Sequence, residues 1–227
     1  MEIETIPKFS IIIPAYNASN HIRKALDSIV NQDFVDDDAY EIIVVCDSCE
    51  DDTEEIAKSY GARTFTVDFH SDGLTRNKGI EEAKGEWLLF MDDDDWWLHE
   101  FVLHIIDGQL KQLNNDLDIL CFGFIWKHRG LALPLGNEGK LFPSVWNKCW
   151  KREFVIKNQL KFPKIHSVSD LYFHTDALKC NPKIMAYDMP LYYYNYLREG
   201  SISEKDKTEE DAVKKELFAK MEADYGI

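Results

Sequence analysis

The chain has 227 residues, of which 45% are hydrophobic, so it can bury a substantial core as one domain or one domain with an appendage. It carries 26 lysines and arginines against 41 aspartates and glutamates, a formal net charge of −15 at pH 7. Such a balance argues against a basic surface for nucleic acid or for an anionic membrane. If the ligand is a phosphate ester, a cation is needed to bridge carboxylates and phosphate.

The cysteines and the hydropathy pattern predict a cytoplasmic protein. There are five cysteines, an odd number, and no hydrophobic signal segment opens the chain. Cys46 and Cys49 form a CxxC, but no second Cys/His pair at zinc spacing follows. No apolar run approaches the ~20 residues of a membrane span, so a lipid-linked acceptor would be met at the inner membrane surface. The oligomeric state is not predicted.

Short β-rich runs alternate with helical stretches in the first half of the chain, which predicts an α/β fold with a mostly parallel sheet covered by helices. The helix expected over Asn20–Gln32 places its apolar residues on one face, and the one over Asp52–Tyr60 has a capping-box pattern of Asp52 and Glu55. The predicted strands are Lys8–Pro14, Tyr40–Cys46, Arg63–Val67, Trp87–Met91 and Asp118–Trp126.

After Trp126 this alternation stops, and glycines and prolines mark a loop-rich passage up to Pro143. A compact pattern resumes over Trp146–Asn158. The remaining expected elements are a helix over Asp170–Lys179, strands over Ile184–Asp188 and Tyr192–Leu197, and a charged helix over Glu209–Tyr225 with a capping box of Thr208 and Asp211.

Polar clusters follow three of the predicted strands: Pro14–Asn17, Cys46–Thr53 and Asp92–Asp95. Ligands of open α/β sheets bind beyond the carboxyl ends of the strands, so these clusters are expected to form the site. The four consecutive carboxylates of Asp92–Asp95 repel one another, and a divalent cation would relieve that repulsion. A solvated acidic turn is the simpler alternative.

At this point the sequence resembles a known family, the family 2 nucleotide-sugar glycosyltransferases, which are inverting enzymes of the GT-A fold. The resemblance covers about residues 8–203 and rests on the order and spacing of FSIIIPAYNASNHIRKALDSIVNQ, EIIVVCDSCEDDT, LTRNKGIEEAKGEWLLFMDDDD, VWNKCWKREF, SDLYF and PLYYYNYLREGSIS. It implies one domain over residues 1–227, with a donor-binding half over about 8–126, an acceptor and catalytic-base half over about 127–203, and a C-terminal helix over 204–227.

The resemblance also implies how a nucleotide-sugar donor, expected to be a UDP-sugar, is held. Tyr16 would stack on the base, and Asp47 would accept a hydrogen bond from it. The family usually has two aspartates followed by Gly-Ser, where this chain has Cys46-Asp47-Ser48-Cys49, so one carboxylate is missing. The implied donor-binding residues are Pro14, Ala15, Tyr16, Asn17, Asp47, Arg76, Asn77, Asp92, Asp93, Arg198 and Ser201.

The family's DXD element falls on Asp92-Asp93-Asp94, with a register that is ambiguous by one residue. Asp94 would be the direct ligand of Mn²⁺ or Mg²⁺, Asp92 its companion, and Asp93 would face ribose or sugar hydroxyls. Arg76 and Asn77 are expected just before a helix, near the charged or sugar portion of the donor. A structural pairing of Arg76 with one of the clustered aspartates is the alternative.

In the family the catalytic base comes from a Glu-Asp pair, which here reads Ser169-Asp170. Asp170 is therefore the expected base, and capping of a helix is its alternative role. The implied mechanism is one in-line displacement at the anomeric carbon, with Asp170 taking the acceptor proton and the metal offsetting charge on the departing diphosphate. Arg198 and Ser201 would contact that diphosphate.

Three other functions remain open on the sequence alone. A phosphohydrolase also has a DxD after a strand, but it needs an early strand and a Thr or Val where Trp96 follows here. A nucleotidyltransferase needs a glycine-rich basic loop near the N-terminus, and that loop is absent. A nucleotide-sugar-binding protein without turnover stays possible because Ser169 replaces the family glutamate.

Overall fold

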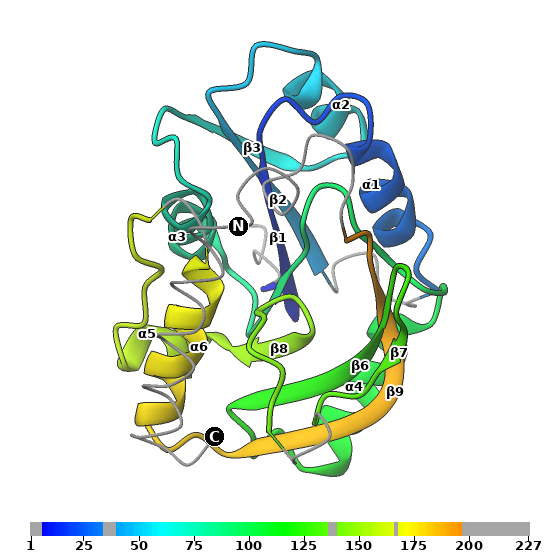
Figure 1. The fold of residues 1–227 in the computed structure, drawn as a ribbon, viewed down its shortest axis with the longest axis vertical. Helices are drawn as coiled ribbons and strands as arrows, with labels where there is room; N and C mark the ends of the chain where they lie inside the picture. The colour runs from blue at the N-terminus through cyan, green and yellow to red at the C-terminus, as the bar shows by residue number, and fades with distance from the viewer. Residues whose placement is uncertain (1–5, 34–39, 136–139, 166–167, 197–227) are drawn as a thin grey trace, which may run out of the picture.

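The computed structural model describes residues 6–33, 40–135, 140–165 and 168–196. Within them a nine-stranded sheet has the order β3-β2-β1-β4-β8-β6-β9-β5, and β7 pairs with β6 (Figure 1). The elements in chain order are β1 (Phe9–Ala15), α1 (Ile22–Val30), β2 (Tyr40–Asp47), α2 (Thr53–Ser59), β3 (Arg63–Val67), α3 (Asp72–Glu82), β4 (Trp87–Phe90), β5 (Trp96–Trp97), α4 (Val102–Gln112), β6 (Ile119–Trp126), β7 (Gly130–Ala132), β8 (Lys148–Lys151), α5 (Arg152–Lys157), α6 (Ser169–Lys179) and β9 (Ile184–Tyr194).

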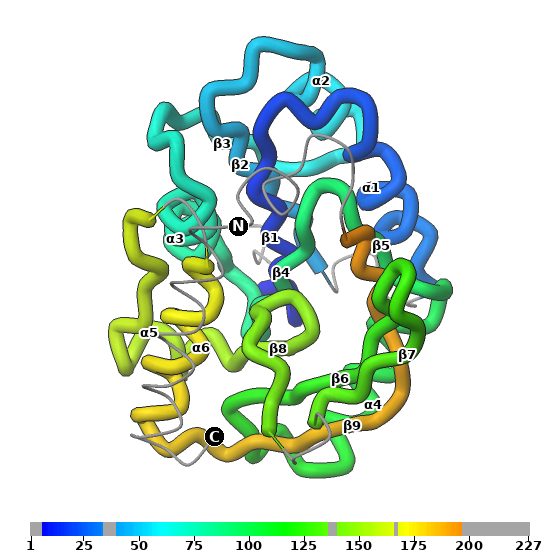
Figure 2. The backbone as a smooth tube through the Cα atoms, in the orientation of Figure 1, coloured from blue at the N-terminus to red at the C-terminus, as the bar shows by residue number. Residues whose placement is uncertain are grey.

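The first four strands form the parallel part of the sheet, which confirms the predicted α/β class. β1 lies between β2 and β4, parallel to both. Its residues Phe9–Ile13 are all buried, as expected of a strand covered on both faces. The other part is mixed, because β8 runs antiparallel to β4 and β6 while β6 and β9 run parallel. Figure 2 shows β9 running alongside β6.

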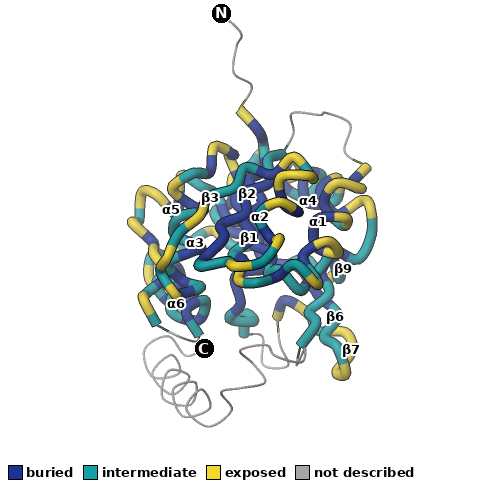
Figure 3. The backbone as a smooth tube through the Cα atoms, turned by 90° about the horizontal axis from the view of Figure 1, so that it is seen from above, coloured by how far each residue is buried: buried dark blue, intermediate teal, exposed yellow. Residues whose placement is uncertain are grey.

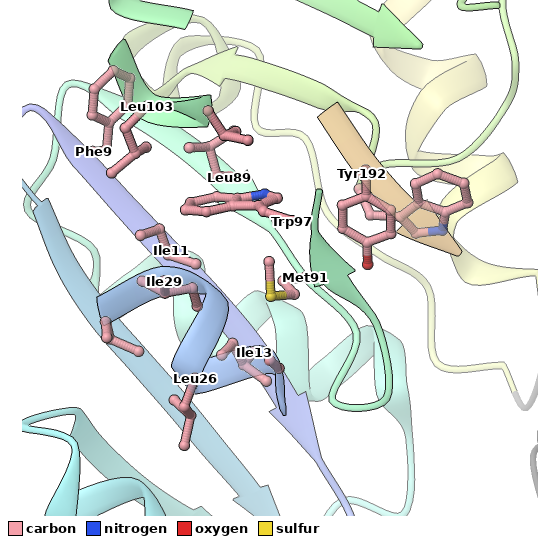
Figure 4. Close-up of a cluster of buried hydrophobic side chains, with 14 of the residues drawn as sticks. Phe9, Ile11, Ile13, Leu26, Ile29, Leu89, Met91, Trp97, Leu103 and Tyr192 are labelled. Atoms are coloured by element: carbon pink, nitrogen blue, oxygen red, sulfur yellow. The ribbon is translucent and has the colours of Figure 1, made fainter. Parts of the chain in front are cut away.

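Two hydrophobic cores lie on opposite faces of the sheet, since successive strand residues point to opposite sides. Ile11 and Ile13 of β1 join the core under α1 and α4, and Figure 4 shows them near Leu26 of α1. Ile12 faces the other way, into the core shared by α3, α5 and α6. Figure 3 shows β1 and β2 buried at the centre of the molecule. No helix in the described ranges has the length and apolarity to cross a bilayer.

A helix was expected just after Arg76 and Asn77, but α3 begins at Asp72, so both residues lie inside it. The helix begins after Ser71, whose hydroxyl accepts the backbone N–H of Leu74. It packs directly on β1. A Cβ at Gly79 would stand 2.3 Å from the Ile12 side chain, so the close approach requires glycine there.

Two further local predictions were only partly right. Asp52 is the N-cap residue of α2, as predicted, but its side chain makes no capping hydrogen bond; Oδ1 of Asp51 accepts the Thr53 N–H instead, at 3.1 Å. The two strands expected after Pro182 form the single strand β9, which passes through Pro190 with an irregular register opposite Gly123. The predicted helix over Glu209–Tyr225 and its capping box lie outside the described residues.

Candidate active site

The three polar clusters meet at one edge of the sheet, as the strand order requires. The backbone N–H of Tyr16, after β1, lies 3.4 Å from Oδ2 of Asp93, after β4. Oδ1 of Asn17 accepts the N–H of Glu50, after β2, at 2.8 Å. The loops after β1, β2 and β4 therefore form one continuous surface.

Tyr16 is 62% exposed at the rim of this surface, so one ring face is accessible to a planar ligand. Pro14 and Ala15 precede it at the end of β1, and Ala15 is buried. Asn17 has a φ of 46°, a left-handed conformation that asparagine tolerates and that turns the chain away from the strand. This turn holds Tyr16 at the rim.

Asp47, at the end of β2, is buried and is bonded to its own chain. Its carboxylate accepts backbone N–H groups of Phe69, His70 and Ser71 at 2.7, 3.0 and 2.9 Å, and the Thr75 hydroxyl at 2.9 Å. Burial alone would raise the pKa of Asp47, but these hydrogen bonds lower it below its ordinary value. The predicted contact with a donor base would have to compete with these bonds. The structure gives Asp47 a role in holding the loop before α3.

We expect Asp47→Ala to lower the free energy of unfolding by about 3 kcal/mol, because several buried donors lose their acceptor at about 1–3 kcal/mol each with partial relaxation. Urea denaturation at pH 7 measures this loss. Asp68→Ala is the matched control, since the Asp68 side chain is 83% exposed and the change should cost under about 1 kcal/mol. Equal stability of the two variants would contradict the structural role of Asp47.

The four aspartates after β4 have different surroundings, and these bear on the register of the acidic motif. Asp95 is fully buried; its carboxylate accepts the Tyr192 hydroxyl at 2.6 Å and the Asn195 N–H at 2.7 Å. Asp93 lies 3.0 Å from Nε2 of His21. Asp92 and Asp94 are only partly buried. The Asp95 side chain is therefore held by contacts within the fold, and the assignment of Asp92 and Asp94 as the metal-binding pair stays a prediction.

Arg76 is the cation at the centre of the acidic groups. Its Nη1 lies 2.6 Å from Asp72 and its Nη2 lies 2.7 Å from Asp92. Burial alone would lower the pKa of Arg76, but Asp92, Asp72 and Asp170 raise it, so the guanidinium stays charged. The structural alternative, pairing with a clustered aspartate, is confirmed.

Asn77, next to Arg76 on α3, is also used inside the fold. Its side-chain amide donates to the carbonyl of Phe162 at 2.8 Å and accepts the Phe162 N–H at 2.9 Å. This two-bond clamp fixes the segment before α6 against α3. The predicted contact between Asn77 and the donor would require the clamp to open.

Asp170 is the second residue of α6, and the residue preceding that helix is Val168, so Asp170 is not its N-cap. Its Oδ1 accepts the Leu171 N–H at 2.9 Å. Burial raises the pKa of Asp170 to about 6; Arg76 opposes this rise, whereas Asp92 and Asp72 add to it. A carboxyl group with such a pKa can exchange a proton near neutral pH.

Ser169 occupies the position of the family glutamate, and its hydroxyl contacts the ion pair of Asp72 and Arg76. Its hydroxyl donates to Asp72 at 2.8 Å and lies 3.4 Å from Nη1 of Arg76. Asp72 thereby supplies a carboxylate beside Arg76 at the position where Ser169 has none. No motif in the sequence singled out Asp72; the only signal was its spacing of four residues from Arg76, which suits a helical ion pair.

A buried lysine, Lys148, lies near Asp170. Nζ of Lys148 donates to the carbonyls of Phe142 and Ser144 at 2.5 Å each and to Asn147 Oδ1 at 2.8 Å. Burial lowers the pKa of Lys148 to about 8, while Cys121 and Asp170 act in the opposite direction. Sequence reasoning did not identify this residue, and it missed His21 and Tyr192 because their partners, Asp93 and Asp95, are distant in sequence. Arg198, Ser201 and His166 lie outside the described residues.

The acidic groups suit a divalent cation that the substrate helps to hold. Asp72, Asp92 and Asp170 all raise the pKa of Arg76, so three carboxylates lie near this one guanidinium. Burial and Asp94 raise the pKa of Asp92 against the effect of Arg76. No three ligand-type side chains of the described ranges are already grouped for a metal. Mg²⁺-type ions often bind through one or two carboxylates plus substrate phosphates, which fits Asp92 and Asp94.

In this structure the parallel strands β1 to β4, with acidic residues after β2 and β4, continue into a mixed sheet. This is the architecture of the GT-A fold. Residues 10–131, more than half of the chain, match the family model Glycosyl transferase family 2. The chain belongs to this family.

Known relatives extend the likeness beyond that segment. The poly(ribitol-phosphate) beta-glucosyltransferase of Bacillus spizizenii is 31% identical over 215 residues, which cover 85% of this chain and 33% of that protein. The structure of Staphylococcus aureus TarS 1–349 with UDP-GlcNAc has a TM-score of 0.76 at 24% identity and covers 88% of this chain and 62% of that one. Glucosyl-3-phosphoglycerate synthase of Mycobacterium tuberculosis, solved with Mn²⁺, UDP and glucosyl-3-phosphoglycerate, has a TM-score of 0.65 at 16% identity and covers 97% and 81%. These two structures show the shared fold. The chain spans 31% to 63% of the length of the curated relatives.

Proposed function

We propose that this chain transfers a sugar from a UDP-sugar to an acceptor hydroxyl, with inversion at the anomeric carbon and with Mn²⁺ or Mg²⁺ as cofactor. The observation that carries the proposal is the meeting of Asp170 with the acidic run after β4 around one guanidinium, Arg76. A proton acceptor and the acidic groups for a metal-diphosphate thus lie at the same sheet edge.

Asp170 is the proposed general base. The carboxylate takes the proton of the acceptor hydroxyl as its oxygen bonds to the anomeric carbon, while the bond from that carbon to the diphosphate oxygen breaks. A pKa of about 6 leaves Asp170 mostly ionised at neutral pH and still basic enough to accept a proton. Ser169 and Arg76 position the start of α6 through Asp72.

The donor is proposed to lie along the loops after β1 and β4. Tyr16 offers an exposed ring for the base, and the Asp93 carboxylate, near Tyr16 and His21, lies where ribose hydroxyls would be met. Asp92 and Asp94 would hold the metal, whose bound charge offsets the charge that develops on the diphosphate.

The two-half organisation, with a donor half over about 8–126 and an acceptor half over about 127–203, belongs to the same proposal. The S. aureus structure with UDP-GlcNAc and the poly(ribitol-phosphate) specificity named for the B. spizizenii relative support a UDP-sugar and a cell-surface polymer. We place the reaction at the cytoplasmic side of the membrane, where such polymers would be assembled.

The experiment is a thermal-shift panel of UDP, UDP-hexoses and GDP, with Mn²⁺ or with excess chelator. A ligand that binds only the folded chain raises the melting temperature by mass action. We expect uridine ligands with Mn²⁺ to give the largest shift, and Asp94→Asn to abolish most of it by removing a ligand charge.

Asp116→Asn is the matched control, because Asp116 is exposed and pairs with Lys183 away from the three loops. It should respond to UDP and Mn²⁺ as the wild type does. Equal shifts in chelator and in Mn²⁺ would overturn the metal assignment. A preference for GDP would overturn the assignment of the base.

A further inference from the structure

The hairpin of β6 and β7 has a charge opposite to that of the rest of the chain. We call residues Trp126–Leu135 the hairpin tip. From position 119 to position 137 the sequence contains no aspartate or glutamate, although the whole chain has 41 of them. Lys127, His128 and Arg129 follow one another at the turn. The hairpin tip is therefore positively charged although the whole chain has a net charge of −15.

The cations of the hairpin tip are not neutralised within the described part of the chain. Arg129 lies with Cζ 4.3 Å from the centre of the Trp126 ring, and it is exposed. No carboxylate of the described ranges forms an ion pair with Lys127 or Arg129. Burial lowers the pKa of Lys24, on α1, and the nearby positive charge of Lys127 lowers it further. This side of the molecule therefore gathers positive charge.

Leucines accompany the charges. Leu131 of β7, Leu133 just after that strand and Leu135 at its bridge to Leu141 are 59%, 42% and 39% exposed. β7 ends at Ala132 and the chain bends at Pro134, so the three leucines lie close together along the chain without forming a continuous strand. Figure 3 shows β7 and the end of β6 projecting from the body of the molecule. Adjacent apolar side chains that project in this way mark an interaction surface.

The hairpin tip lies beside the candidate active site. The Lys127 N–H donates to the carbonyl of Tyr194 at 3.0 Å, and the next residue, Asn195, donates its N–H to Asp95. The turn of the hairpin therefore lies beside the end of β9, where the next residue contacts the acidic run. Whatever binds the hairpin tip is brought to the edge of the sheet where an acceptor would enter.

We propose that the hairpin tip docks on an anionic lipid bilayer, with Lys127 and Arg129 at the headgroups and Leu131 and Leu133 in the interfacial region. Basic residues next to apolar side chains are the pattern of interfacial membrane anchors. At physiological salt the Debye length is about 8 Å, so the more distant carboxylates of the acidic body act only weakly on the hairpin tip. A second copy of the chain suits the patch less well, because paired tips would bring like charges together. The docking does not depend on sugar transfer.

The test is co-sedimentation with sucrose-loaded vesicles of phosphatidylcholine alone or with phosphatidylglycerol, in moderate salt. We expect the wild type to bind only the anionic vesicles and to dissociate as salt is raised. Lys127→Gln with Arg129→Gln, and separately Leu131→Ser with Leu133→Ser, should each lower the partition coefficient by about tenfold or more, where tenfold equals about 1.4 kcal/mol.

The matched controls are Lys157→Gln and Ile156→Ser on α5, an exposed cation and an exposed apolar residue on the opposite side of the view in Figure 1. They should bind vesicles as the wild type does, and UDP-induced thermal shifts should be alike in all variants, which separates a failure of docking from a failure of the proposed function. Unchanged vesicle binding by the hairpin variants would overturn the proposal. The proposal would also be overturned if the wild type bound no vesicles and instead formed a dimer in sedimentation equilibrium that the leucine variants abolish.

Discussion

Asp170→Asn should leave the fold and the affinity for UDP and metal nearly unchanged and remove almost all sugar transfer. A general base contributes typically ~10²–10⁴-fold to rate, and its effect is realised in the transition state, so the loss should appear in kcat. Asparagine keeps the size of the side chain and its acceptor for the Leu171 N–H, so a purely structural role predicts near-normal turnover. The wild-type rate should also rise with pH through about 6, because only the ionised carboxylate accepts a proton.

Asp176→Asn is the control on the same helix. Asp176 is exposed and pairs with Lys179, so its loss should leave turnover within about twofold of wild type. If instead Asp176→Asn lost transfer and Asp170→Asn retained more than about a tenth of the rate, the base would be misassigned. Retained donor binding with no transfer by the wild type on a broad panel of sugar donors and acceptors would favour a binding protein without turnover.

Arg76→Met should destabilise the chain more than any exposed ion-pair variant. The substitution leaves Asp72 and Asp92 without their close cation, and removing one partner of a buried pair typically costs about 3–5 kcal/mol. Chemical denaturation without ligand measures the loss. Mn²⁺ should restore part of the lost stability, because a divalent ion offsets charge in the same place.

Arg63→Met is the comparison for Arg76. Arg63 also pairs with two carboxylates, Glu41 and Glu82, but its side chain is 36% exposed, so its loss should cost only about 1 kcal/mol. Similar losses for the two arginines would mean that Arg76 is not the electrostatic centre of the site.

The parts of the fold that were predictable are those encoded by local pattern. The apolar run of β1 and the helical spacing of Ile22, Leu26 and Ile29 identify their elements without other information. The start of α3 at Asp72 was not predicted, because Gly73 and Gly79 have low helix propensity. These glycines are required by contacts with Pro163 and with Ile12, which only the tertiary structure reveals.

The candidate site was predictable in position and less so in detail. Polar clusters at strand ends of a parallel sheet must meet at one edge, and they do. Sequence alone could not separate the four neighbouring aspartates, since the burial of Asp95 depends on Tyr192, 97 residues away. Likewise the four hydrogen bonds that Asp47 accepts from Phe69, His70, Ser71 and Thr75 depend on how the loop before α3 closes over β2.

Strand β9 has a consequence for the order in which the protein matures. Its Tyr192 and the following Asn195 supply the partners that hold the buried Asp95 carboxylate. During synthesis the strands β1 to β4 emerge first and can pair with one another, but the acidic loop stays without these partners until residues 192–195 have left the ribosome. The parallel strands can therefore form early in synthesis, whereas the acidic loop of the candidate site reaches its final contacts only after β9 has been made.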